Sequence, residues 1–330
     1  MNNMKIESLQ HFAQLQTTTS EGLSAEMKTF YDMSLIDEAS ANLVHDQFGQ
    51  KRPIPMGGGK TIEFRKFTPL DKALTPLTEG ITPDGKSLTV STVTATVNQY
   101  GDYITQSDML ELTSVDNTIL EATKLLGRQA GLTLDTVVRN VLQSGTNVTY
   151  CPKVVDGAET EVTSREALGE GCQLTVDVVQ QVVAKLRAQN APTIGGKYIA
   201  IIHPYVAYDL MRDPEWREAY QYAKPENLYE GEVGELAGVR FVQTTEAKIY
   251  DGGIFGSLFF GDGAYGVTEI TGGGLQTIVK QKGSSGTSDP LDQRSSVGWK
   301  AVKTAELLVP SYLVRVESYS DRFSKIAKAN

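Results

Sequence analysis

The feature that most constrains the fold is one long amphipathic helix, predicted over Asp116–Ser144. Apolar or small residues recur there in steps of three and four, the spacing of one helix face. Asp116 or Asn117 can cap its start, and Gly145 can end it. At 1.5 Å per residue, such a helix reaches roughly 40 Å, the width of a whole small domain. The residues of this face are Ile119, Thr123, Leu126, Ala130, Leu134, Val137 and Val141.

Two glycines lie inside this helix, at Gly127 and Gly131. Glycine lowers helix propensity, so its presence in a helix interior needs a reason. The two residues are four apart and therefore share one face. Because glycine has no side chain beyond a hydrogen, we expect another backbone to approach the helix closely at this face.

The residues before the helix cannot form a core alone. Residues 1–50 are polar, with one short amphipathic helix predicted at Glu21–Leu35. Residues 51–106 hold two strand-like runs, Thr61–Phe67 and Leu88–Val97, separated by a proline-containing polar stretch. A long two-stranded ribbon is marginally stable by itself. We therefore expect residues 1–50, which form an arm, and the ribbon at 51–106 to gain stability from neighbouring subunits.

The rest of the chain mixes helices and strands, which indicates an α+β fold. Residues 145–173 are predicted to be loop-like, and a helix is predicted at Leu174–Asn190. Two further helices begin at Pro204 and Pro214, each with proline in its first turn. Strands are predicted at Lys197–Ile202, Val239–Thr244, Leu258–Gly261, Val297–Leu308 and Tyr312–Tyr319.

Composition excludes several classes of function. The 330 residues carry a net charge of −9, which argues against a broad nucleic-acid-binding face, because such faces neutralise phosphates with Lys and Arg. Cys151 and Cys172 are the only cysteines and there are three histidines, so a four-ligand zinc site is hard to build. We expect two reduced thiols, no metal and no cofactor. The sequence lacks a secretory leader or an apolar run that could span a bilayer, so a soluble protein made in a cytoplasm is expected.

The stretch Pro55–Phe64 contains Gly59-Lys60-Thr61, the ending of a nucleotide-binding P-loop. The complete motif needs a glycine five residues before Gly59, and position 54 is Ile. A P-loop also opens a helix, whereas β-favouring residues follow Lys60. The prediction is a glycine turn that leads into a strand. An ATPase is the alternative, in which Lys60→Ala would remove nucleotide binding.

His203 is the one candidate for catalysis. It follows a buried strand, a position where catalytic residues often lie in α/β folds, and Asp209 and Asp213 are near in sequence. Neither a nucleophile nor an oxyanion loop accompanies it. We therefore expect His203 to cap or pack at a strand-to-helix junction. No catalytic, cofactor-binding or metal-binding residue is predicted.

Several stretches resemble the major capsid proteins of tailed phages with the Hong Kong 97 fold, in particular the coat proteins of N4-like phages. The resemblance covers nearly the whole chain, and its specificity comes from the number and order of the matching stretches. They are Leu43–Gly49, Gly57–Phe64, Thr96–Tyr103, Tyr198–Pro204, Gly231–Arg240 and Asp289–Lys300.

This resemblance implies a self-assembling shell protein of the phage head. It implies an N-terminal arm at residues 1–50 and an extended β loop at 51–106 that laps a neighbouring subunit. A peripheral domain with the long spine helix would follow at 107–194, an axial domain at 195–285, and strands returning to the peripheral domain at 286–330.

The partners implied are further copies of the chain, in hexameric and pentameric capsomers, with scaffold, portal and decoration proteins. Packaged double-stranded DNA would make only weak, non-specific contact, and no membrane is involved. The protein would act in the virion capsid and assemble in the bacterial host cytoplasm. Two alternatives stay open: an encapsulin-like cargo shell, and a soluble enzyme that uses His203, in which His203→Ala would abolish turnover.

Overall fold

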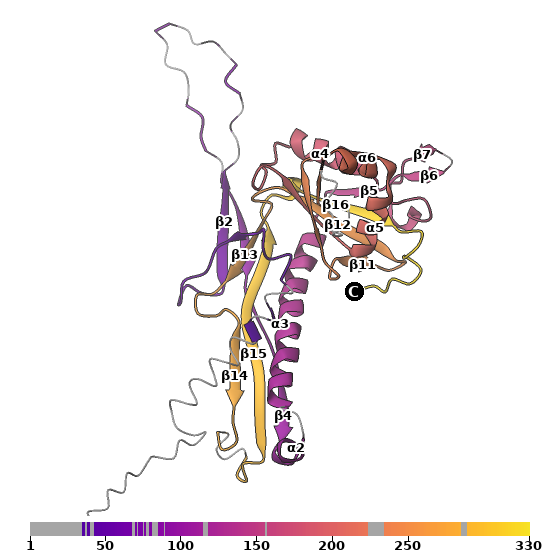
Figure 1. The fold of residues 1–330 in the computed structure, drawn as a ribbon. Helices are drawn as coiled ribbons and strands as arrows, with labels where there is room; N and C mark the ends of the chain where they lie inside the picture. Colours follow the sequence, from indigo (N-terminus) through magenta and orange to yellow (C-terminus); the bar gives the residue numbers. More distant parts are fainter. Residues whose placement is uncertain are drawn as a thin grey trace, which may run out of the picture.

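The computed structural model describes residues 35–36, 38–39, 43–67, 90–114, 118–155, 157–223, 234–284 and 289–330, with scattered positions between 70 and 88. The chain has an elongated part, in which one long helix lies along a sheet, and an α/β part at one end of that helix (Figure 1). The helix predicted at Glu21–Leu35 lies outside the described residues except for Leu35, as do the predicted caps Asp116 and Asn117.

The long predicted helix is confirmed as α3, which spans Thr118–Gln143. Its buried face packs on the five-stranded sheet, where Leu126, Ala130 and Leu134 meet the inner residues of strand β15, among them Trp299. Leu142, near its other end, packs into a second cluster beneath the α/β part. One helix therefore joins both parts of the molecule.

Strand β15, Arg294–Leu307, is the axis of the five-stranded sheet. On one side it pairs antiparallel with β4, Asn98–Ser107. On the other side it pairs with β13, Tyr265–Glu269, and β14, Gln276–Lys280. The short strand β1, Gln50–Lys51, extends the sheet parallel to β13.

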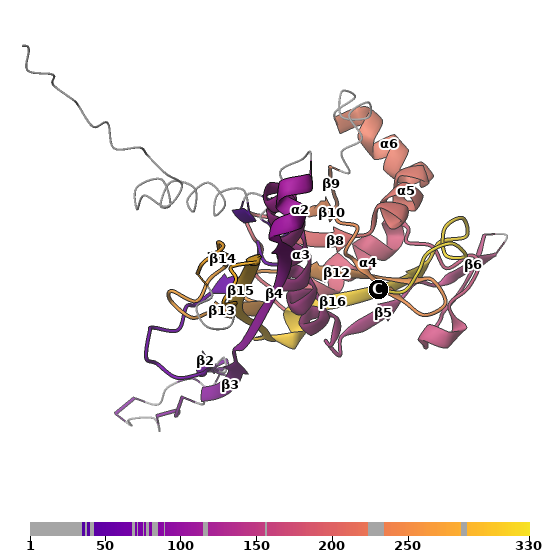
Figure 2. The same ribbon diagram turned by 90° about the horizontal axis from the view of Figure 1, so that it is seen from below.

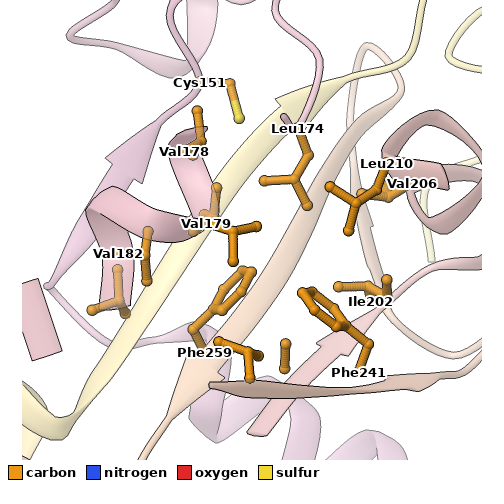
Figure 3. Close-up of a cluster of buried hydrophobic side chains, with 14 of the residues drawn as sticks. Cys151, Leu174, Val178, Val179, Val182, Ile202, Val206, Leu210, Phe241 and Phe259 are labelled. Carbon is orange, nitrogen blue, oxygen red and sulfur yellow. The ribbon is translucent and has the colours of Figure 1, made fainter. Parts of the chain in front are cut away.

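A seven-stranded sheet forms the α/β part, with helices α4, α5 and α6 packed around it (Figure 2). Its core is apolar. The rings of Phe241 and Phe259 meet edge to face, with their centroids 6.3 Å apart, below the buried valines of α4, which are Val178, Val179 and Val182 (Figure 3). The helices are α4 Val176–Ala188, α5 Pro204–Arg212 and α6 Pro214–Ala223. In sheet order the strands are β5 Val148–Tyr150, β16 Leu313–Tyr319, β12 Ile254–Phe260, β8 Tyr198–Ile202, β10 Val239–Gln243 and β9 Glu235–Leu236, with β11 Lys248–Tyr250 beside β12.

The remaining predicted helices and strands are confirmed with shifts of up to four residues at their ends, and Thr175 caps α4 as its sequence indicates. The prediction of a loop at 145–173 is wrong, because β5 lies there together with the hairpin of β6, Lys153–Val155, and β7, Ala158–Thr160. A single helical turn follows at Arg165–Ala167. These strands are three residues long, too short to show alternation, and β5 is stabilised by pairing with β16.

Strand β4 and the short helix α2, Asp108–Thr113, were not predicted either. The sequence of β4 is polar and contains Gly101, so its own residues favour a strand only weakly. Its conformation comes from ten residues of continuous pairing with β15.

Candidate assembly surfaces

The predicted ribbon is confirmed as a separate two-stranded sheet. Strand β2, Thr61–Phe67, pairs antiparallel with β3, Val90–Thr96, over all seven residues. At its base Phe64 is buried against Gly266 of β13. Beyond this base the ribbon projects away from both parts of the chain (Figure 1).

Three leucines of the loop between β2 and β3 are exposed: 56% of Leu70, 82% of Leu74 and 66% of Leu88. A single exposed leucine needs no explanation, but three on one projection form an apolar surface without a core of its own. A thin ribbon has no second layer that could cover them. Within the part of the chain that the structure describes these leucines are left uncovered, which is the character of a surface that another molecule buries.

The P-loop-like stretch before β2 is a tight turn. Gly57 and Gly59 both have positive φ, at 84° and 87°, and the Gly58 N–H donates to the Pro55 carbonyl at 2.9 Å. Lys60 is exposed and the chain then enters β2, not a helix. The predicted turn into a strand is confirmed, and the turn lacks the helix N-terminus that cradles phosphates in a P-loop.

A strap, residues 43–54, crosses the molecule between helix α3 and the five-stranded sheet. Its main contact is a buried pair: Asp135 Oδ2 lies 2.6 Å from His45 Nδ1, and both side chains are fully buried. Asp135 Oδ1 also accepts hydrogen bonds from the backbone N–H groups of Val44 and His45, at 2.8 and 2.7 Å. One carboxylate therefore holds the turn of the strap onto α3.

Other bonds hold the strap to the sheet. The Tyr265 hydroxyl donates to the His45 carbonyl at 2.5 Å, and Lys303, nearly buried, pairs with Asp46 at 2.9 Å. Farther along, the Ile54 N–H donates to the Glu269 carbonyl at 2.8 Å. The strap thus fixes the point from which the ribbon leaves the body.

The strap was not predicted from the sequence, although the sequence contains a signal for it. Asp135 stands four residues after Gly131, on the side of the long helix where a close backbone neighbour is predicted. A buried carboxylate is costly unless it is paired and hydrogen-bonded, so its position indicates a polar partner from elsewhere. The partner lies 90 residues away and cannot be chosen from spacing alone.

The expected close approach at Gly127 and Gly131 is confirmed. A Cβ built on Gly131 would lie 2.4 Å from the Ala39 carbonyl oxygen, and one on Gly127 would lie 2.8 Å from that of Leu35. Leu35 itself is fully buried against α3. The part of the arm that the structure describes therefore packs backbone to backbone on the spine helix.

His203 caps and packs, as expected. Its Nδ1 accepts a hydrogen bond from the Tyr205 N–H at 3.2 Å at the start of α5, and its ring packs against Tyr205 and Phe255. Asp213 is also structural, since its carboxylate accepts hydrogen bonds from the N–H groups of Val176 and Glu215. These contacts explain both residues without a substrate.

The burial of His203 predicts a pH effect on stability. Desolvation lowers the pKa of His203 in the folded chain to about 4. Between pH 6.5 and pH 4, His203 is therefore protonated in the unfolded chain but neutral in the folded chain. Stability then falls as pH decreases from 6.5 towards 4, by about 1–3 kcal/mol from this residue. We expect His203→Gln, compared with wild type by urea unfolding at pH 7 and pH 4.5, to be less stable at pH 7 and to lose that deficit at pH 4.5. Parallel pH profiles would contradict this account.

The two cysteines are free and fully buried, as predicted for reduced thiols. Burial raises the pKa of the Cys151 thiol well above its usual range, which makes it unreactive. Among the residues that the structure describes, no three His, Cys, Asp or Glu side chains are grouped so that they could hold a metal ion. Within the same residues, none of the helices combines the length and apolar character that crossing a bilayer requires.

Comparison with known families decides the identity. The family model of the phage capsid protein matches residues 90–314, which include α3, most of the α/β part and β15. The chain belongs to the phage capsid protein family. A search of curated proteins finds no match to this capsid protein.

Solved structures agree with this family at the level of the fold. The capsid of Ralstonia phage GP4 matches with a TM-score of 0.62 and 13% identity, over 85% of this chain and 89% of the other. The capsid of Cyanophage P-SCSP1u matches with a TM-score of 0.61 and 13% identity, over 83% and 87%. A virus-like particle from Pyrococcus furiosus matches with a TM-score of 0.52 and 11% identity, over 88% and 99%.

These findings confirm the predicted Hong Kong 97-type α+β fold and the predicted function, a major capsid protein of the phage head. The family implies a structural role in the virion capsid and not an enzymatic one. The finer assignment to the N4-like branch stays a prediction.

Proposed function

We propose that copies of this capsid protein assemble into hexameric and pentameric capsomers, and that these close an icosahedral head around double-stranded DNA. The observation that carries this proposal is the loop between β2 and β3, whose three exposed leucines have no apolar layer to cover them among the described residues. A neighbouring copy supplies that layer. Each contact is modest, but it repeats around a closed ring, so that many weak contacts together give a stable shell.

We also propose the domain roles that the sequence predicts. Residues 1–50 form the arm and 51–106 the extended loop, 107–194 the peripheral domain and 195–285 the axial domain at the capsomer centre, and 286–330 return to the peripheral domain. The division into a helix-on-sheet part and an α/β part supports a body of two domains, with β5 and α4 of 107–194 in the α/β part and β13 and β14 of 195–285 in the five-stranded sheet. Strand β16 lies in the sheet of the α/β part, so the returning segment joins both.

The charge supports weak contact with packaged DNA. With a net charge of −9, the wall of the head repels phosphates on balance and lets DNA slide past without holding it. We propose assembly in the bacterial host cytoplasm, with scaffold, portal and decoration proteins as further partners. A head isolated with nuclease-protected DNA would support this function, whereas one filled with a single protein would favour a cargo shell.

The first test is the assembly state of the purified chain. We expect sedimentation velocity and negative-stain electron microscopy to show rings of five or six copies, or closed shells, in a concentration-dependent equilibrium with single chains. A chain that stays monomeric at every concentration tested would contradict the proposal.

A further inference from the structure

Two arginines and a tyrosine meet on the surface of the α/β part. Tyr208 and Arg212 lie one turn apart on α5, and Arg322 comes from the turn after β16, which runs past that helix (Figure 1). The Tyr208 hydroxyl accepts hydrogen bonds from Nη1 of both arginines, at 3.1 Å from Arg212 and 3.4 Å from Arg322. The two guanidinium carbons lie 5.7 and 5.9 Å from the centre of the tyrosine ring. We call these three residues the two-arginine site.

The turn that carries Arg322 is fixed to the protein on two sides. The ring of Phe323 meets the ring of Tyr208 edge to face, with centroids 5.4 Å apart. The buried Ser324 hydroxyl donates to the Gly253 carbonyl at 2.6 Å. Arg322 therefore stands beside an anchored pair of residues, and its position next to α5 is built into the fold.

The two positive charges have no counter-ion of their own. Asp209 and Asp321 are the nearest carboxylates in the chain, but in the part that the structure describes neither forms an ion pair with an arginine of the site. Asp321 Oδ1 accepts instead from the Gly171 N–H at 2.9 Å, and Asp209 is half-buried, so that desolvation raises the pKa of its carboxyl. Two guanidinium groups that meet at one oxygen repel each other, and an anion between them would remove that repulsion.

The site offers hydrogen-bond donors in three directions. Each guanidinium group carries several N–H donors in a planar fork, and the tyrosine oxygen takes only one from each arginine. Because this oxygen accepts from both arginines, the O–H of Tyr208 is itself available as a donor. The hydrogen bond from Arg212 lowers the pKa of Tyr208, which strengthens that donor. Donors from three sides match a tetrahedral phosphate, which has more acceptor oxygens than a carboxylate has.

We propose that Arg212, Arg322 and Tyr208 bind a phosphate group. Its source is either free inorganic phosphate or the backbone of DNA, and the second source rests on the proposed function, in which the head encloses DNA. The net charge of −9 is compatible with such a site, because a chain that repels phosphates on balance can still bind one at a single point. The affinity is weak, since both arginines are exposed and two carboxylates lie near.

A titration with inorganic phosphate tests the site on the purified full chain. We expect phosphorus NMR at low ionic strength to show binding that Arg212→Gln with Arg322→Gln weakens by at least about tenfold, because charge-assisted hydrogen bonds from both guanidinium groups are lost. Tyr208→Phe keeps the ring beside Phe323 and is expected to weaken binding by about two- to tenfold, because one donor is lost.

The matched control removes the same positive charge from the same segment. Lys325→Gln with Lys328→Gln alters two exposed residues outside the two-arginine site, so we expect a change in phosphate affinity of less than about twofold. Equal losses in the two double variants would overturn the inference, because general charge attraction would then explain the binding. Absence of phosphate binding by wild type would overturn it as well.

A second titration identifies the source of the phosphate. If the site takes DNA, fluorescence anisotropy with a short double-stranded DNA is expected to show binding that inorganic phosphate competes for and that the double arginine variant weakens more than the double lysine variant does. If the arginine variant changes phosphate affinity but not DNA affinity, the site takes the free ion. Both titrations use single chains, so they stand even if the chain fails to assemble, an outcome that would count only against the proposed function.

Discussion

Replacement of Asp135 by alanine is expected to destabilise the unassembled chain by about 3–5 kcal/mol, measured by urea unfolding. The carboxylate accepts two backbone N–H groups and contacts the imidazole of His45, at distances of 2.6 to 2.8 Å in a fully buried site. Each buried donor left without a partner costs about 1–3 kcal/mol. Partial relaxation of the strap keeps the total below the sum of the separate losses.

The controls for this prediction follow from the geometry. Asp135→Asn keeps one acceptor oxygen and is expected to lose less than Asp135→Ala. Asp262 is exposed in a turn, so Asp262→Ala is expected to change the free energy of unfolding by no more than about 0.5 kcal/mol. An effect of Asp135→Ala below about 1 kcal/mol would show that the strap is not held by this carboxylate.

The second large effect is expected on assembly. The triple variant Leu70→Ser, Leu74→Ser and Leu88→Ser should leave the stability of the single chain nearly unchanged, because all three side chains are mostly exposed. Burial of a leucine by a neighbouring copy contributes about 1.5–3 kcal/mol. Loss of three such contributions at every copy of a ring is expected to abolish rings and shells, as measured by sedimentation velocity.

The matched control replaces the same three leucines by methionine. Methionine keeps the apolar character and nearly the volume of leucine, so rings and shells are expected to persist. If the serine variant assembles as well as wild type does, the loop leucines are not an assembly surface.

Local patterns predicted the fold where a segment carries its own signal. Helix α3 was predicted to within one residue at its end, because its apolar face repeats over seven turns, and its predicted start lies outside the described residues. The glycines within it predicted a close backbone neighbour, which is the segment at Leu35 and Ala39. The ribbon was predicted because β-favouring residues dominate β2 and β-branched residues dominate β3.

Contacts between distant residues were the part that the sequence could not supply. Strand β4 is polar, and its strand conformation depends on β15, almost 200 residues later. The pairing of His45 with Asp135 depends on where the strap crosses α3, which no local pattern states. The exposure of Leu112 in α2 was not predictable either, because a leucine in a short helix has the same sequence signal whether it faces the core or the solvent.

The central claim is that the loop between β2 and β3 packs on a neighbouring copy of the chain. A cryo-electron microscopy map of the assembled particle that resolves side chains tests this claim most directly. We expect Leu70, Leu74 and Leu88 of one copy to be buried against a second copy of the same capsomer. A map in which the loop folds back on its own chain, or projects into solvent while the rings are intact, would contradict the account.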